Sequence, residues 1–138
     1  MQRSSSSNKG FSLVELIIVI SIMAVLIGIL APQFISYIHK SKVASDWANL
    51  KAYYSEIETD YVDNNGTPNP DVPTVDHSPG SDDKYRRREI KFLDGRTVKL
   101  KAGFYAVIFE NGGYQISYYC DKYSEWEKHQ TCALTLGL

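Results

Sequence analysis

Apolar residues are concentrated in one run near the start of this 138-residue chain. From Phe11 to Ala31 there are 21 residues, and Glu15 is the only charged one among them. At ~1.5 Å of rise per residue, a helix of this length spans about 31 Å, the thickness of a bilayer's hydrocarbon core. Each Leu, Ile, Val or Phe favours insertion by roughly 0.3 to 0.6 kcal/mol, so together they outweigh one acid near the edge. The pattern predicts a membrane helix over 11–31.

After Ala31 the pattern becomes amphipathic. Apolar side chains recur every three or four residues, which draws one stripe on a helix over 32–62: Val43, Trp47, Leu50, Tyr54, Ile57 and Tyr61. The charged residues lie mostly off this stripe: Lys42, Asp46, Lys51, Glu56 and Glu58. Pro32 lacks an amide hydrogen and its ring crowds the carbonyl of Gly28, so a weak point is expected between them. It is either a simple kink or a segment that unwinds.

Residues 63–84 are predicted to form a long loop between the helix and the next elements. Asp63-Asn64-Asn65-Gly66 tolerates left-handed backbone conformations, so the helix should end near Tyr61 or Val62. The acids near this loop offer the oxygen ligands that calcium prefers: Asp63, Asp71, Asp76, Asp82 and Asp83. Their spacing matches no EF-hand, and a solvated acidic loop needs no ion. We therefore expect no metal site.

Alternating segments separated by turn residues dominate the part from 85 to 138. The turn signals Asp94-Gly95 and Asn111-Gly112-Gly113 pair 89–93 with 96–101 and 104–110 with 114–120. The apolar positions on one face would cover the helix stripe: Ile90, Phe92, Val98, Leu100, Ile116 and Tyr118. The predicted fold class is α+β, with a long amino-terminal helix, half membrane and half amphipathic, packed on a four-stranded antiparallel sheet.

Charge and candidate chemistry add little. The 15 Lys and Arg nearly balance the 16 Asp and Glu, so the chain has no general attraction to nucleic acid. One basic cluster could contact the phosphates of DNA: Lys84, Arg86, Arg87 and Arg88. The alternative is a solvated strand entrance balanced by neighbouring acids, or an edge strand protected by charge. The three histidines have no nucleophile or ligand spacing around them, so we expect no enzymatic activity and no cofactor.

A short polar leader, residues 1–10, precedes the apolar run and ends in Gly10. A secretory signal peptide would carry its cleavage site after the apolar core, so the order here is reversed. The stretch KGFSLVEL over 9–16, with Pro32 further on, resembles the class III leader of type IV prepilins and pseudopilins. The resemblance implies that a prepilin peptidase cuts after Gly10 and that the new terminal residue, Phe11, is N-methylated.

The same resemblance implies a structural subunit of a type IV pilus filament, active in adhesion, motility or DNA uptake. The chain would be a single-pass protein of the cell membrane, from which an inner-membrane assembly platform extracts it into an extracellular polymer with itself and minor pilins. Glu15 has no cationic partner within its own sequence, and it would pair with the amino terminus of a neighbouring subunit. The Gly28 to Pro32 segment would unwind when subunits pack.

Two other functions remain open. One is a pseudopilin of a type II secretion or DNA-uptake system, which forms a short envelope-spanning filament. The other is a monomeric membrane-anchored binding module that never polymerises.

Cys120 and Cys132 are the only cysteines, and an even pair in an exported protein is typical of a disulfide. Closing a loop of about 13 residues would stabilise the fold by roughly 3 kcal/mol in the chain-entropy model. Pilins often carry such a bridged loop near the carboxyl terminus, so the resemblance supports the pairing. Two free thiols or a metal site are the alternatives.

The leader generates the first testable prediction. Replacing Gly10 with a bulky residue such as Leu should block cleavage, because the peptidase must approach the backbone closely there. The mass of the membrane-associated chain reports the cleavage directly. A wild-type chain that keeps residues 1–10 in its native membrane would show that the prepilin assignment is wrong.

Overall fold

The computed structural model describes residues 10–75, 87–120 and 133–137. These contain one helix, α1 (Leu13–Asp63), and the strands β1 (Thr74–Val75), β2 (Glu89–Lys91), β3 (Thr97–Lys99), β4 (Gly103–Glu110), β5 (Gly113–Cys120) and β6 (Leu134–Leu136). The chain divides into two compact units, Met1–Ile38 and His39–Leu138. We describe each unit by itself, and α1 contributes residues to both.

The helix α1 is continuous over 51 residues and includes Pro32. It ends at Asp63, one residue beyond the predicted end, where the chain turns into left-handed backbone at Asn65 (φ 56°) and Gly66 (φ 75°). The Gly66 amide donates to the Tyr61 carbonyl oxygen at 2.9 Å, which satisfies one of the last carbonyls of the helix. The turn chemistry read from the sequence therefore predicted this end correctly.

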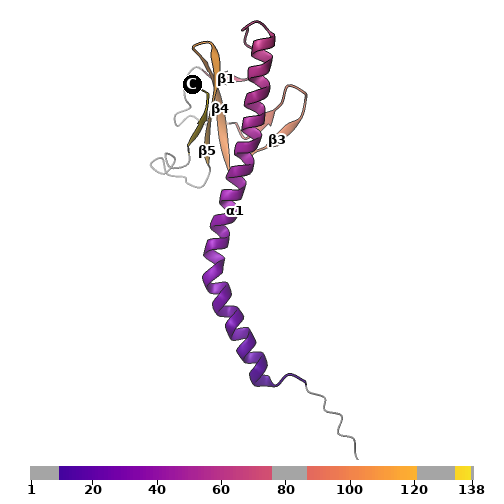
Figure 1. Ribbon diagram of the computed structural model, residues 1–138, viewed down its shortest axis with the longest axis vertical. Coiled ribbons are helices and arrows are strands. Elements are labelled where there is room, and N and C mark those ends of the chain that lie inside the picture. The colour runs from indigo at the N-terminus through magenta and orange to yellow at the C-terminus, as the bar shows by residue number, and fades with distance from the viewer. Residues whose placement is uncertain (1–9, 76–86, 121–132, 138) are drawn as a thin grey trace, which may run out of the picture. The chain divides into compact units, whose positions relative to one another are not determined.

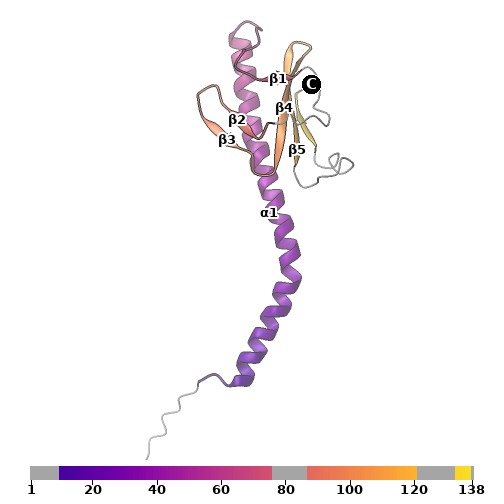
Figure 2. The ribbon, with the colours of Figure 1, turned by 180° about the vertical axis from the view of Figure 1, so that it is seen from behind.

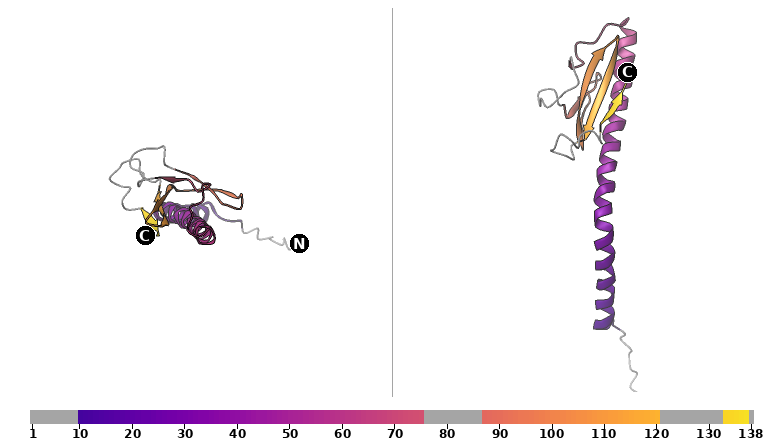
Figure 3. Two further views of the ribbon diagram at one scale, coloured as in Figure 1. Left: turned by 90° about the horizontal axis from the view of Figure 1, so that it is seen from above. Right: turned by 90° about the vertical axis from the view of Figure 1, so that its left-hand side faces the viewer.

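The second unit contains two sheets. The larger has the strand order β1-β4-β5-β6, in which β1 runs parallel to β4 and the other pairs are antiparallel. The smaller is the antiparallel hairpin of β2 and β3. In Figure 1 the strands β4 and β5 run beside the carboxyl-terminal half of α1, and the view from above in Figure 3 shows the β2–β3 hairpin displaced laterally from them over the same face of the helix. Figure 2 shows the hairpin from behind. The fold is α+β with a mixed sheet.

The predicted single antiparallel sheet is therefore wrong, although both predicted hairpins form. Ile90 pairs with Val98 in one hairpin, and Val107 pairs with Ile116 in the other. In the described part of the chain, an isolated bridge joins Arg87, just before β2, to Tyr105 on β4, and the Tyr105 hydroxyl donates to the Glu89 carbonyl at 3.0 Å. The larger sheet takes its other strands from a segment predicted as loop, β1, and from the tail, β6. Turn residues determine a hairpin locally, whereas the pairing between distant strands depends on the whole core.

The core of the second unit combines the helix stripe with both sheets, and Figure 3 shows α1 lying along the face of the larger sheet. All six predicted stripe residues and all six predicted sheet positions belong to this core or pack against it. The prediction missed Tyr53, which is fully buried and makes edge-to-face contacts with Phe92 (5.7 Å) and Tyr105 (6.2 Å). Such aromatic pairs stabilise by about 0.5 to 1.5 kcal/mol beyond their buried area.

A carboxylate begins the buried face of α1. Asp46 is completely buried and accepts hydrogen bonds from the backbone amides of Lys101 and Ala102, both at 2.7 Å, and from the Tyr118 hydroxyl at 2.9 Å. Buried charges are tolerated in proteins only when their oxygens are satisfied in this way. The sequence pattern placed Asp46 off the apolar stripe, and the structure shows instead that it joins the helix to the segment preceding β4.

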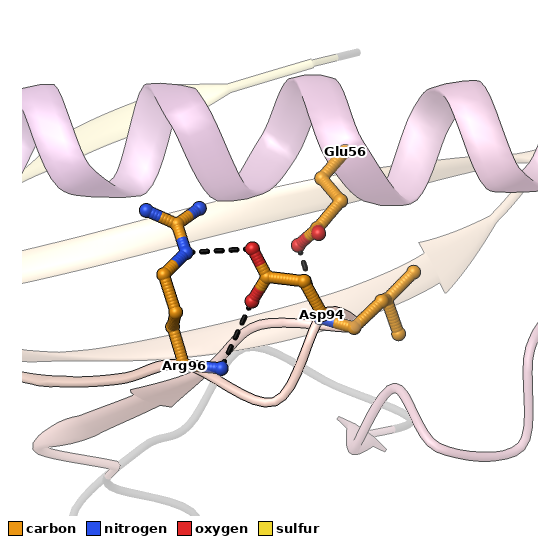
Figure 4. Close-up of polar contacts among 4 residues, drawn as sticks. Glu56, Asp94 and Arg96 are labelled. Atoms are coloured by element: carbon orange, nitrogen blue, oxygen red, sulfur yellow. Dashed lines mark hydrogen bonds and ion pairs between the residues drawn. The ribbon is translucent and has the colours of Figure 1, made fainter.

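Three more carboxylates on α1 accept hydrogen bonds from elsewhere in the second unit. Glu56 accepts the amide of Leu93 at 3.1 Å, next to the hairpin tip where Arg96 donates to Asp94 (Figure 4). Glu58 accepts the amide of Tyr114 at 3.0 Å, and Asp60 accepts the side-chain amides of Asn64 and Asn69 at 3.0 and 2.9 Å. The helix is thus held to both hairpins by hydrogen bonds to its acids as well as by apolar packing.

Asp46→Ala should lower the free energy of unfolding of the second unit by about 3 kcal/mol, because it leaves buried donors without an acceptor. Asp63→Ala is the matched control, since Asp63 is an exposed acid of the same helix; it should change the stability by about 0.5 kcal/mol or less. Denaturant unfolding of the full chain in detergent, followed by near-ultraviolet circular dichroism, measures both. Equal effects of the two substitutions would contradict the anchoring role of Asp46.

Burial, with a smaller contribution from Glu56, raises the pKa of Tyr53 to about 12 from its ordinary value near 10. Between about pH 10 and 12 the unfolded chain therefore releases a proton that the folded chain retains, so stability falls as pH rises. Tyr53→Phe removes the titrating group, so the free energy of unfolding should fall by about 2 kcal/mol less over that pH range than in the wild type. Unfolding measured at pH 9, 10, 11 and 12 tests the difference, and parallel profiles for the two proteins would refute it.

Candidate functional site

The predicted leader junction lies in an open position. Gly10 and Phe11 precede α1 and both are exposed, Phe11 to 89%. No heavy atom lies within 4 Å of the position that a Cβ on Gly10 would take, leaving out its two chain neighbours. The requirement for glycine here is therefore not set by packing within the described chain. Cleavage after Gly10 and methylation of Phe11 stay predictions, for which this exposed junction is suitable.

Glu15 forms a capping box with Ser12 at the start of α1. The Ser12 amide donates to Glu15 Oε2 at 3.1 Å, and the Glu15 amide donates to Ser12 Oγ at 3.2 Å. Each side chain thus satisfies a backbone amide that the helix itself leaves unpaired. The carboxylate also lies at the amino-terminal end of the helix, where the macrodipole carries partial positive charge.

The sequence reasoning missed this arrangement, although its signal was present. Ser12-Leu13-Val14-Glu15 has the S-x-x-E spacing of a capping box directly before an apolar run. The Glu15 carboxylate does have a partner within its own chain, the Ser12 amide, but this partner is not a cation. A carboxylate at this position is therefore compatible with a membrane helix before any second subunit is present.

The rest of the first unit is an exposed apolar surface. Mean hydropathy reaches 3.0 over an 18-residue window of α1, and none of that window is buried, so the helix is long and apolar enough to cross a membrane. Its large apolar side chains from Leu13 to Ile38 are between 41% and 74% exposed. The Ser21 hydroxyl donates to the Ile17 carbonyl at 2.6 Å, so this polar group is satisfied inside the helix. Such a surface is stable only inside a bilayer or against other apolar surfaces.

The predicted weak point lies within this helical segment. Gly28 and Pro32 are both helical, and a Cβ on Gly28 would meet no atom within 4 Å apart from the backbone of its own helix. The backbone of α1 is thus unbroken there in the single chain. Unwinding on assembly stays a prediction, since it depends on neighbouring subunits.

The remaining predicted sites lie in the second unit or outside the described residues. Cys120 is completely buried at the end of β5 and is not a free cysteine. Cys132 lies outside the described residues, so the bridge between them stays a prediction. Arg87 and Arg88 are exposed before β2, whereas Lys84 and Arg86 also lie outside the described residues.

Metal ligation finds no support in the part of the chain that the structure describes. No group of three or more His, Cys, Asp or Glu side chains is gathered there in a way that could hold an ion. Three of the acids considered as calcium ligands lie outside the described residues: Asp76, Asp82 and Asp83.

Comparison with known proteins agrees with the geometry of the amino-terminal segment. Residues 5–31 match the family described as the prokaryotic N-terminal methylation motif. Over 55 residues the chain is 40% identical to the type IV major pilin protein PilA of Myxococcus xanthus (strain DK1622). The aligned stretch covers 40% of this chain and 25% of that relative. No solved structure matches the chain. The methylation motif, the exposed apolar helix and the capped glutamate together make the amino-terminal segment of this chain similar to that of a type IV pilin.

Proposed function

We propose that this chain is a structural subunit of a type IV pilus filament and has no enzymatic role. The observation that carries the proposal is the exposed apolar surface of α1 over 13–38, interrupted by a single carboxylate at Glu15. Burying a Leu, Ile or Val side chain stabilises by roughly 1.5 to 3 kcal/mol, so this surface strongly favours any state that covers it. A bilayer covers it before assembly, and neighbouring helices cover it within a filament.

The amino terminus explains how the chain would pass from the membrane-embedded state to the filament. Cleavage after Gly10 by the prepilin peptidase creates a positively charged amine at Phe11, four residues before Glu15. In the membrane the capping box supplies the Glu15 carboxylate with one neutral donor, the Ser12 amide, but no opposite charge. In a filament the amine of a neighbouring subunit would supply that charge in a low-dielectric environment, where an ion pair is strong and an unpaired charge is costly. This pairing would determine the axial position of each incoming subunit.

The comparison favours a pilus filament over a secretion pseudopilus. The matched relative is named a major pilin, although the match covers only a quarter of its length. In this function the chain is stored in the cell membrane, is extracted by an inner-membrane assembly platform, and ends in an extracellular polymer with itself and minor pilins. The second unit, with its predicted Cys120–Cys132 bridge, would form the exported surface of that polymer.

Glu15→Val should abolish filaments while leaving membrane insertion intact, because it removes one charge from an apolar segment. The capping box allows two sharper variants. Glu15→Gln keeps a side-chain acceptor for the Ser12 amide but loses the charge, so it should also fail to assemble. Ser12→Ala keeps the charge and loses the cap hydroxyl, so it should still assemble. Electron microscopy of cells that express each variant as the sole copy measures filaments, and membrane fractionation measures insertion.

The possible results separate the competing explanations. Normal filaments from Glu15→Val would contradict the pairing. Filaments from Glu15→Gln together with none from Ser12→Ala would assign the role of Glu15 to capping. A wild-type chain that inserts in its native cell but never forms filaments would favour the monomeric membrane anchor instead.

A further inference from the structure

One end of the second unit carries uncompensated negative charge, here called the acidic end and defined as residues 55–75. It contains five acids and no Lys or Arg: Glu56, Glu58, Asp60, Asp63 and Asp71. The end of α1 lies within it, and the last turn of the helix has no basic residue. Acids there oppose the macrodipole, whose negative end is at the helix carboxyl terminus. The acids in this last turn therefore destabilise the end of the helix.

The partners of these acids do not neutralise them. Glu56 and Glu58 accept backbone amides, and Asp60 accepts two asparagine side chains, so every described donor is neutral. Asp63 and Asp71 are exposed. The accumulated negative charge acts on nearby groups: after burial, which is the larger cause, Glu58 raises the pKa of Tyr54, and Asp60 and Glu58 contribute to the raised pKa of Tyr114.

The β2–β3 hairpin carries the opposite charge. Residues 87–101 contain six Lys and Arg and only two acids. The register pairs Ile90 with Val98 in the core, so the alternate pairs, Glu89 with Lys99 and Lys91 with Thr97, face outward. The same alternation puts Lys101 on this side, and all three lysines are exposed. We call Lys91, Lys99 and Lys101 the basic row.

The basic row is not neutralised within the described part of the chain. The ion pair found there joins Arg96 to Asp94 at the hairpin tip, at 2.6 Å, and involves no residue of the row. Glu89 lies directly opposite Lys99 but forms no ion pair with it among the described residues. Among the residues that the structure describes, each surface therefore carries several charges of one sign and forms no ion pair with the other sign.

We propose that the basic row of one copy binds the acidic end of a second copy. The two surfaces are complementary in sign, with three lysines on one and five acids on the other, and both are present on every copy. This inference rests on the proposed function, since a polymer holds many copies at high local concentration, where weak charge contacts add together. A nucleic acid is a less suitable occupant, because the five acids of the same unit would repel it. The contact should weaken as ionic strength rises.

The first test asks whether the contact exists in the unaltered chain. Full-length unlabelled and 15N-labelled chains are mixed in detergent at high concentration and low salt, then treated with a carbodiimide, which joins amines directly to touching carboxylates. We expect mixed-isotope links from Lys91 or Lys99 to Asp63 or Asp71, reduced at least about fivefold in 0.5 M salt. The absence of mixed links between these two surfaces would overturn the proposal.

The second test uses charge reversal in the native cell. Lys91→Glu with Lys99→Glu makes both surfaces acidic, and Asp63→Lys with Asp71→Lys puts cations at the two exposed acids of the acidic end, so each variant alone should yield at least about fivefold fewer filaments. Cells that produce both variants should recover filaments, because each surface again finds an opposite one on the other chain. The matched control reverses two cations outside the row, Lys42 and Lys51, and should assemble normally.

These outcomes also separate this contact from the proposed function. Mixed-isotope links from a wild-type chain that never forms filaments would keep the contact and overturn the filament. Normal filaments from either reversed variant alone would keep the filament and overturn the contact. Loss of binding to a duplex DNA fragment in Lys91→Glu with Lys99→Glu, with filaments unchanged, would also overturn the contact and assign the basic row to a polyanion.

Discussion

The second unit depends on one buried carboxylate more than on any other single group. Asp46 begins the buried helix face, and Leu50, Tyr53 and Ile57 follow it. Its two oxygens accept three hydrogen bonds from the segment before β4 and from β5, over sequence separations of 55 to 72 residues. Apolar packing alone permits a helix to slide or rotate on a sheet, since it has no direction. A buried charge with three specific donors permits one position, because any displacement leaves it unsatisfied.

This arrangement explains why the sequence predicted the elements better than their assembly. The helix and its apolar stripe follow from a periodicity that is visible in a single segment, and the two hairpins follow from Asp94-Gly95 and from Asn111-Gly112, where Asn111 and Gly112 adopt positive φ angles. The prediction left Asp46 and Tyr53 out of the buried helix face. A hydropathy pattern treats Asp46 as an exterior residue, which moved the predicted stripe away from Tyr53. The strands β1 and β6 are two and three residues long, and only pairing with β4 and β5 defines them.

In the candidate site, too, the sequence predicted local features better than contacts between distant groups. The leader, the apolar run and Glu15 were all readable, because each is contiguous in sequence. The Ser12–Glu15 capping box was equally readable from its spacing, and it was missed because Glu15 was considered only as a charge in need of a cation. What no single chain can contain is the environment of Glu15 after assembly, since that environment belongs to other copies.

The carboxylates of α1 therefore serve different purposes according to the donors that face them. At the first turn Glu15 accepts the backbone amide of Ser12, which makes a charge more tolerable in an apolar segment. At the centre of the second unit Asp46 meets amides of distant segments and joins them to the helix. At the last turn Asp60 meets only neutral amides and Asp63 is exposed, so their charge extends into the surroundings. A helix that stabilised only itself would place cations at that end, so the acids there are better explained by a partner outside the chain.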